Sequence, residues 1–111
     1  MPYLSVVTPT YNEEDNIVEL CNAVQKIFHE VGYDYEHIII DNSSKDSTVS
    51  KVKSLILQNP SIKLIVNDKN YGHLLSPVHG IKQTSGDATI LINADFQDPP
   101  ELIKKLIKSW E

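Results

Sequence analysis

The 111-residue chain contains no arginine, a single cysteine and only four glycines. Its ten basic residues are therefore all lysines, and fifteen acidic residues give a formal net charge of −5. Arginine is the side chain that forks onto phosphates and guanine edges, so nucleic acid is not an expected partner. Cys21 can form no internal disulfide, which favours a reducing compartment and a buried, hydrophobic role for its thiol.

The scarcity of glycine excludes the glycine-rich nucleotide cradles. No two glycines have the spacing of G-x-G-x-x-G or of G-x-x-x-x-G-K, so dinucleotide and P-loop motifs are absent. Apolar runs are only a few residues long, and the N-terminus lacks the layout of a signal peptide. We therefore expect a cytoplasmic location, at the cytoplasmic face of the membrane if the full-length protein is membrane-bound. The composition, 41% hydrophobic and 23% charged, fits one globular domain.

Short apolar runs alternate with stretches of helical period in four strand-then-helix units. The predicted strands are Leu4–Thr8, His37–Ile40, Ile62–Val66 and Ala88–Ile92. Their continuous apolar character is typical of parallel strands covered on both faces. The pattern predicts an α/β fold with a parallel sheet.

Apolar residues at steps of three or four predict four helices. The first has its stripe from Ile17 to Val31 and ends near Gly32, and the second begins at about Asp46 and stops at Asn59. The third carries Leu74, Leu75, Val78 and Ile81. The fourth has Asp98 as its cap and Pro99 in its first turn, with an apolar stripe of Leu102, Ile103, Leu106, Ile107 and Trp110.

Polar side chains follow three of the predicted strands at one edge of the sheet. Right-handed crossovers place all strand carboxyl ends along this edge, where open α/β sheets bind ligands. The residues are Pro-Thr-Tyr-Asn-Glu at 9–13, Asp-Asn-Ser-Ser at 41–44 and Asn-Ala-Asp-Phe-Gln-Asp at 93–98. Carboxylates, amides and an aromatic ring are groups that a nucleotide and a hard divalent cation use.

Several of these residues have a structural alternative. Tyr11 suits stacking on a nucleobase, but it also suits a turn before a helix. Asp41 either caps its loop or contacts a ligand, and Asp98 is better explained as a helix cap. Asp95 has no such explanation, because it follows a buried strand and no helix begins before Pro99. The four histidines lack the spacing of zinc ligands.

Taken as an ordered series, these residues resemble the inverting family 2 glycosyltransferases. The series is Pro-Thr-Tyr-Asn-Glu-Glu at 9–14, Asp-Asn-Ser-Ser-Lys-Asp-Ser-Thr at 41–48, Asn-Tyr-Gly-His at 70–73 and Asn-Ala-Asp-Phe-Gln-Asp-Pro-Pro-Glu-Leu-Ile at 93–103. It spans essentially the whole chain. The third segment and the Gln-Asp-Pro-Pro-Glu run at 97–101 are similar to the branch that transfers sugars to polyprenyl or dolichyl phosphate.

The resemblance implies the nucleotide-diphospho-sugar transferase (glycosyltransferase type A) fold, a three-layer α/β/α sandwich with a Rossmann-like parallel sheet in the strand order 3-2-1-4. Residues 1–111 would be its donor-nucleotide-binding half. It implies inverting transfer from a UDP- or GDP-sugar to an acceptor such as polyprenyl phosphate, as in cell wall or polysaccharide biosynthesis. Asp95 would be the catalytic carboxylate and would hold Mg²⁺ or Mn²⁺ against the diphosphate, with Gln97 assisting. The nucleotide-sugar-binding residues implied are Pro9, Tyr11, Glu13, Asp41, Asn93, Ala94 and Asp95.

Three positions depart from the family pattern. Asn42 and Asn93 stand where the family usually has carboxylates, and Ser43 stands where glycine is common. Asparagine keeps a hydrogen-bonding oxygen but lacks the charge, so it binds a cation less strongly than a carboxylate does.

The acceptor half of the family's domain has no counterpart in this sequence. The resemblance puts the catalytic base, the acceptor site and any membrane helices beyond residue 111, so no base is assigned and the 111-residue fragment is expected to be inactive.

The alternative function is a nucleotide-binding module or remnant without turnover. A phosphorelay receiver domain is a further alternative function. It would need paired acidic residues after the first strand and a lysine after a fifth strand. An exposed apolar face is expected on a half domain, which predicts a homo-oligomer.

Overall fold

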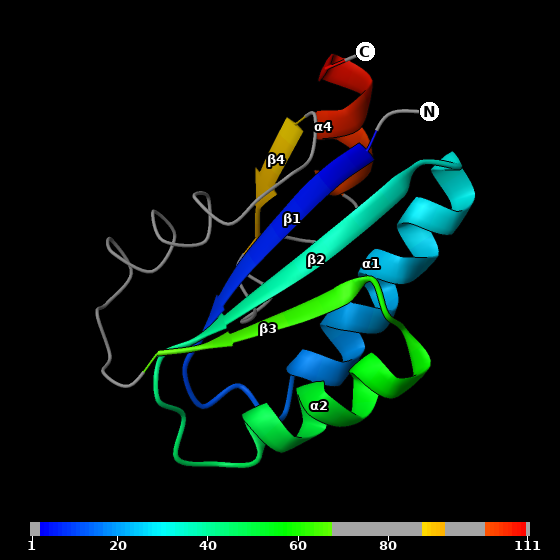
Figure 1. Cartoon of the computed structure of the whole chain (residues 1–111). Coiled ribbons are helices and arrows are strands. Elements are labelled where there is room, and N and C mark those ends of the chain that lie inside the picture. The colour runs from blue at the N-terminus through cyan, green and yellow to red at the C-terminus, as the bar shows by residue number, and fades with distance from the viewer. Residues whose placement is uncertain (1–2, 68–87, 93–101, 111) are drawn as a thin grey trace.

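Four parallel strands form a single sheet in the order β3-β2-β1-β4 (Figure 1). The computed structural model describes residues 3–67, 88–92 and 102–110. The strands are β1 (Tyr3–Thr10), β2 (Asp34–Asp41), β3 (Ile62–Val66) and β4 (Ala88–Leu91). The predicted strand order and the predicted parallel direction are both confirmed.

The two central strands extend further toward the carboxyl edge than predicted. Pro9 and Thr10 belong to β1 and Asp41 is the last residue of β2, whereas the sequence pattern assigned all three to loops. The register pairs Thr10 with Asp41, and the N–H of Asn42 donates to the carbonyl of Thr10 at 2.9 Å. Ladder hydrogen bonds to a neighbouring strand therefore outweigh the low strand preference of proline and aspartate.

The described helices are α1 (Ile17–Val31), α2 (Thr48–Gln58) and α4 (Leu102–Trp110). Helix α1 ends as predicted, because Gly32 adopts φ 76° and its N–H donates to the carbonyl of Phe28. Helix α2 begins two residues later than predicted. The Asp46 carboxylate accepts hydrogen bonds from the N–H and the hydroxyl of Thr48, so Asp46 lies ahead of the first turn.

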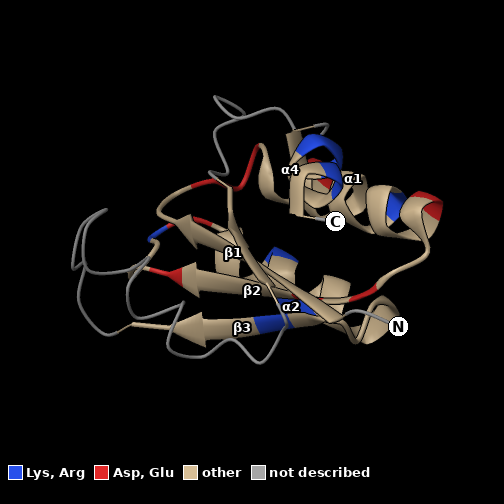
Figure 2. Ribbon diagram, turned by 90° about the horizontal axis from the view of Figure 1, so that it is seen from above, with Lys and Arg blue, Asp and Glu red and all other residues tan. Residues whose placement is uncertain are grey.

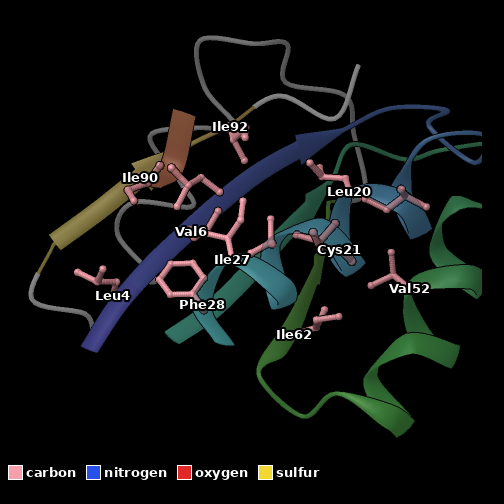
Figure 3. Close-up of a cluster of buried hydrophobic side chains, with 14 of the residues drawn as sticks. Leu4, Val6, Leu20, Cys21, Ile27, Phe28, Val52, Ile62, Ile90 and Ile92 are labelled. Atoms are coloured by element: carbon pink, nitrogen blue, oxygen red, sulfur yellow. The ribbon is translucent and has the colours of Figure 1, made fainter. Parts of the chain in front are cut away.

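The main core lies between one face of the sheet and these three helices. Figure 3 shows side chains of β1, β4, α1 and α2 in this core, with Leu4, Val6 and Phe28 in the same cluster. The ring of Phe28 also stacks on Tyr35 of β2, with ring centroids 4.6 Å apart. Cys21 is buried in this core, as predicted, and burial raises the pKa of its thiol to about 12.

Only two of the five residues in the apolar stripe predicted on the fourth helix are buried. Ile103 and Ile107 of α4 are buried in the core, but Leu102, Leu106 and Trp110 are 37–45% exposed. The two isoleucines are one helical turn apart and face the sheet. Leu102, Leu106 and Trp110, also spaced four residues apart, lie on an adjacent face of the helix. No described helix is long and apolar enough to cross a lipid bilayer.

The opposite face of the sheet carries a smaller buried cluster of Val7, Ile38 and Ile40. The helix predicted around Leu74 to Ile81, which would complete the third layer, lies outside the described residues. So do the predicted cap at Asp98 and the proline at 99.

One histidine is completely buried beneath the helices. The Nε2 atom of His37 lies 2.8 Å from the hydroxyl oxygen of Thr8, and its Nδ1 has no hydrogen-bond partner in the described part of the chain. Burial lowers the pKa of His37 from 6.5 to about 3, because the charged imidazolium would lose its hydration. The ring is therefore neutral in the folded protein at neutral pH.

This burial predicts that the fold loses stability in mild acid. Between pH 6.5 and about pH 3 the unfolded chain binds one more proton at His37 than the folded chain does. The free energy of unfolding therefore decreases as the pH is lowered through this range. At pH 5 the loss relative to pH 7 amounts to about 2 kcal/mol. Urea unfolding at the two pH values measures it.

The variant His37→Gln should lose most of this pH dependence, and His29→Gln provides the matched control because His29 is exposed. An unchanged pH dependence in His37→Gln would show that other groups cause the acid sensitivity.

Candidate functional site

The loops that follow β1 and β2 lie side by side at the carboxyl edge of the sheet. Figure 2 shows acidic positions gathered at the arrowhead ends of these two strands and in the loops beyond them. The two strands are paired up to Thr10 and Asp41, so the loops leave the sheet from adjacent points. Side-chain to backbone hydrogen bonds then connect one loop to the other.

Asp41 lies at the centre of this arrangement and is completely buried. Its Oδ1 accepts hydrogen bonds from the hydroxyls of Thr10, at 3.0 Å, and Ser44, at 2.5 Å. Its Oδ2 accepts the N–H of Ser44 at 2.8 Å. A buried carboxylate without partners would be strongly destabilising, and these three donors replace its hydration.

Asn12, in the loop after β1, makes two hydrogen bonds to the loop after β2. Its N–H donates to the hydroxyl oxygen of Ser44 at 2.9 Å, and its Oδ1 accepts the N–H of Lys45 at 2.8 Å. Asn12 has φ 54°, in the left-handed region that asparagine tolerates better than most residues. This conformation turns the chain directly after Tyr11.

A second set of bonds involves Asp46 and Thr48 at the start of α2. Thr48 Oγ1 accepts the N–H of Glu13 at 2.9 Å, and Asp46 Oδ2 accepts the N–H of Glu14 at 3.2 Å. Lys51 donates to the carbonyl of Glu14 at 2.9 Å. Burial alone would raise the pKa of Asp46, but hydrogen bonds from Thr48 and from backbone N–H groups lower it below its ordinary value.

Asn67, directly after β3, ties the third strand to the same loop. Its Nδ2 donates to Asn42 Oδ1 at 2.9 Å, and its carbonyl accepts the hydroxyl of Ser43 at 2.6 Å. Ser43 has φ 60°, so the position where the family commonly has glycine is a left-handed one. The serine keeps this conformation while its hydroxyl holds the end of β3.

Four of the predicted site residues fall within the described part of the chain, and all four lie at this edge. Pro9 is buried in β1, Tyr11 is 41% exposed, and Glu13 is partly buried with its Oε2 3.3 Å from the side-chain nitrogen of Asn16. Asp41 takes the loop-capping role that the sequence offered as an alternative, by accepting the N–H of Ser44. Asn93, Ala94, Asp95 and Gln97 lie outside the described residues.

Sequence reasoning did not assign a role to Thr10, Asn12, Ser44 or Asn67, which hold the edge together. Each lies within or beside a recognised segment, but only the folded chain shows which serine of the pair 43–44 contacts Asp41. The hydroxyl-rich run at 43–48 was a usable signal, because such residues bond to nearby backbone groups in turns.

The described residues contain no cluster of side chains that could bind a metal ion. Within residues 3–67, 88–92 and 102–110, no group of three or more histidine, cysteine or acidic side chains could hold a cation. The ligands predicted for the metal, Asp95 and Gln97, are oxygen donors of the kind that Mg²⁺ and Mn²⁺ prefer.

A cavity of about 690 Å³ lies at the opposite edge of the sheet, beside the start of each of the first three strands. Tyr3, Tyr33 and Pro60 are among its lining residues, and none of the predicted site residues that the structure describes is. The carboxyl edge is where open α/β sheets bind ligands, so the loops there are the better candidate site.

Comparison with known proteins gives the family. The family model described as Glycosyl transferase family 2 matches residues 5–111. A dolichol-phosphate mannosyltransferase from Pyrococcus furiosus is 37% identical over 106 residues, which cover 96% of this chain and 29% of the relative. The chain spans about a third of the length of the curated relatives it matches.

Solved structures share the fold. The S. aureus protein TarS, residues 1–349 in complex with UDP, superposes with a TM-score of 0.72 at 26% identity, over 95% of this chain and 32% of that one. The mannosyltransferase PcManGT from Pyrobaculum calidifontis, in complex with GDP-Man and Mn²⁺, gives 0.74 at 24% identity, over 85% of this chain and 28% of that one.

The left-handed conformation at Ser43 leads to a prediction on stability. Ser43→Ala loses the hydroxyl bond to Asn67 and keeps the unfavourable φ, whereas Ser43→Gly loses the bond but relieves the backbone. We expect Ser43→Gly to be more stable than Ser43→Ala by about 1 kcal/mol in urea unfolding. An alanine variant as stable as the glycine variant would contradict the assigned conformation.

Proposed function

This chain belongs to glycosyltransferase family 2, and on that premise we propose that it binds the nucleotide of a UDP- or GDP-sugar. The proposed reaction of the whole protein is transfer of that sugar, with inversion, to an acceptor of the polyprenyl-phosphate class. The observation that carries the proposal is the interlocked pair of loops after β1 and β2. These loops bring Tyr11 and Asp41 to the edge of the sheet where α/β folds bind nucleotides.

The described residues suit a nucleoside. Tyr11 exposes 41% of its surface, which leaves a ring face for a base to stack on. Asp41 is buried in this structure, and in the proposal a local movement uncovers its carboxylate so that it accepts a base N–H or a ribose hydroxyl. Glu13 lies in the loop just before α1, where Asn16 contacts its side chain and Thr48 accepts its backbone N–H. In the proposal, Pro9, Tyr11, Glu13 and Asp41 thus form the nucleoside side of the donor site.

The diphosphate side is assigned to the segment after β4. Asp95 and Gln97 would hold Mg²⁺ or Mn²⁺, and Asn93 and Ala94 would contact the donor beside them. A bound cation would neutralise the charge that develops on the nucleoside diphosphate as the glycosidic bond breaks. With no arginine in these 111 residues, lysine is the residue whose side chain is positively charged at neutral pH and could share this role. The complex of PcManGT with GDP-Man and Mn²⁺ supports the pairing of metal and donor.

The acceptor is proposed from relatives rather than from residues of this chain. The relative from Pyrococcus furiosus is named a dolichol-phosphate mannosyltransferase, and one from Pseudomonas fluorescens an undecaprenyl-phosphate 4-deoxy-4-formamido-L-arabinose transferase. A lipid phosphate is already ionised at neutral pH, so it needs less help from a general base than a sugar hydroxyl does. The alternative function, nucleotide binding without turnover, uses the same donor site.

Removal of the Asp95 carboxylate tests the metal assignment. Calorimetric titration of UDP and GDP in the presence of Mn²⁺ should show that Asp95→Ala binds the nucleotide at least about tenfold more weakly than the wild type, because a charged ligand of the cation is lost. Asp34→Ala is the matched control, since Asp34 is exposed at the opposite end of β2. Equal binding by the wild type and Asp95→Ala would remove Asp95 from the metal site.

Tyr11 gives a separate test of the nucleoside side. Loss of base stacking in Tyr11→Ala should weaken nucleotide binding by about 1–2 kcal/mol, roughly tenfold. Tyr11→Phe keeps the ring face and should bind within about twofold of the wild type. If both variants bind as the wild type does, Tyr11 serves only as a turn residue.

A further inference from the structure

We propose that Ser44 is a positioning residue, which fixes the Asp41 carboxylate so that one lone pair of Oδ2 is left for the nucleoside. The inference rests on the proposed function and concerns how its donor site is organised. It comes from the hydrogen bonds around Asp41, which use a serine that the motif series does not assign to any role.

The bonds at Asp41 leave little freedom to its side chain. A carboxylate has about four lone-pair positions, two on each oxygen. Oδ1 accepts two hydroxyls, from Thr10 and Ser44, so both of its positions are used. Among the described residues, Oδ2 accepts only the N–H of Ser44, which leaves one position. Oδ2 is therefore the atom to which a base N–H or ribose hydroxyl would donate.

Ser44 also links the loop after β1 to Asp41 through hydrogen bonds. Its hydroxyl oxygen accepts the N–H of Asn12 at 2.9 Å, and its proton is then directed to Asp41 Oδ1 at 2.5 Å. A serine hydroxyl has one proton and two lone pairs, so this pair of bonds assigns its donor to Asp41. Asn12 directly follows Tyr11 in the chain, so the same hydroxyl links the stacking ring to the carboxylate.

Access to Oδ2 requires a local movement, because no part of Asp41 is exposed in this structure. The two hydroxyl bonds to Oδ1 hold the carboxylate in place while Oδ2 is uncovered. A site organised in this way binds with less loss of side-chain entropy than one whose carboxylate is free to rotate.

The position of Asp41 matters to the nucleoside and not to the diphosphate. Its negative charge attracts hydrogen-bond donors and repels phosphate oxygens. A defect in its orientation therefore weakens binding of UDP or GDP, while binding of pyrophosphate with Mn²⁺ is preserved. A defect that merely loosens the fold weakens both.

The experiment compares these two ligands on Ser44→Ala, with calorimetry in Mn²⁺ and thermal unfolding to confirm that each variant folds. Nucleotide affinity should fall about tenfold, the effect of one hydrogen bond to a charged group. Pyrophosphate affinity should change by less than about twofold. Ser44→Thr keeps the hydroxyl and should restore nucleotide binding.

Two further variants complete the design. Ser54→Ala is the matched control, because Ser54 is exposed on α2 and its hydroxyl bonds only to the carbonyl of Ser50. Thr10→Val removes the other hydroxyl from Oδ1 and should give the same selective loss, which provides the test if Ser44→Ala does not fold.

Equal loss of nucleotide and pyrophosphate affinity in Ser44→Ala and Thr10→Val would overturn the inference, as would wild-type nucleotide binding by both. A wild-type protein that binds neither UDP nor GDP would overturn the proposed function, and the inference with it.

Discussion

The parallel pairing of β1 with β2 is the constraint on which the candidate site depends. Their register brings Thr10 opposite Asp41, at the last residue of each strand. Both chains then leave the sheet at adjacent points, so residues that are some thirty positions apart in the sequence become neighbours. The hydrogen bonds of Asn12, Ser44 and Thr48 between the two loops are possible only from this starting geometry. A shift of one residue in the pairing register would move every side chain of the shifted strand to the other face of the sheet.

The carboxyl edge shows how this fold keeps polar groups where the core would otherwise exclude them. Thr10, Asp41, Asn42 and Asn67 are all buried or nearly so. Hydroxyls and amides of neighbouring segments satisfy them, so the loops gain fixed positions in place of hydration. His37 illustrates the opposite solution, since its buried ring has a single hydrogen-bond partner among the described residues and burial keeps it neutral. Polar groups thus organise the edge, whereas the apolar contacts of α1 stabilise the sheet beneath it.

The structure shows one contact of Asn42, a position where the resemblance leads us to expect a carboxylate. Asn42 accepts a hydrogen bond from Asn67, which an aspartate could also do, so its amide is not needed for that contact. The difference between Asn42 and an aspartate at this bond is therefore one of charge. A site with fewer carboxylates repels the donor diphosphate less and attracts the cation less, and the proposed reliance on Asp95 follows from that balance.

The sequence by itself determined the strand order, the parallel direction, the extent of α1 and the family. Apolar periodicity and an ordered series of motifs are local properties, and a parallel sheet with right-handed crossovers follows from them. The sequence did not determine that β1 continues through Pro9 and Thr10, that α2 starts at Thr48, or that three of the five residues of the α4 stripe are exposed. Ladder bonds between strands decide the first point, hydrogen bonds from Thr48 to Asp46 the second, and the packing of α4 against the core the third. Only the tertiary structure decided which of two adjacent serines bonds to Asp41, because that choice depends on the left-handed turn at Ser43 and on contacts with Asn12 and Asn67.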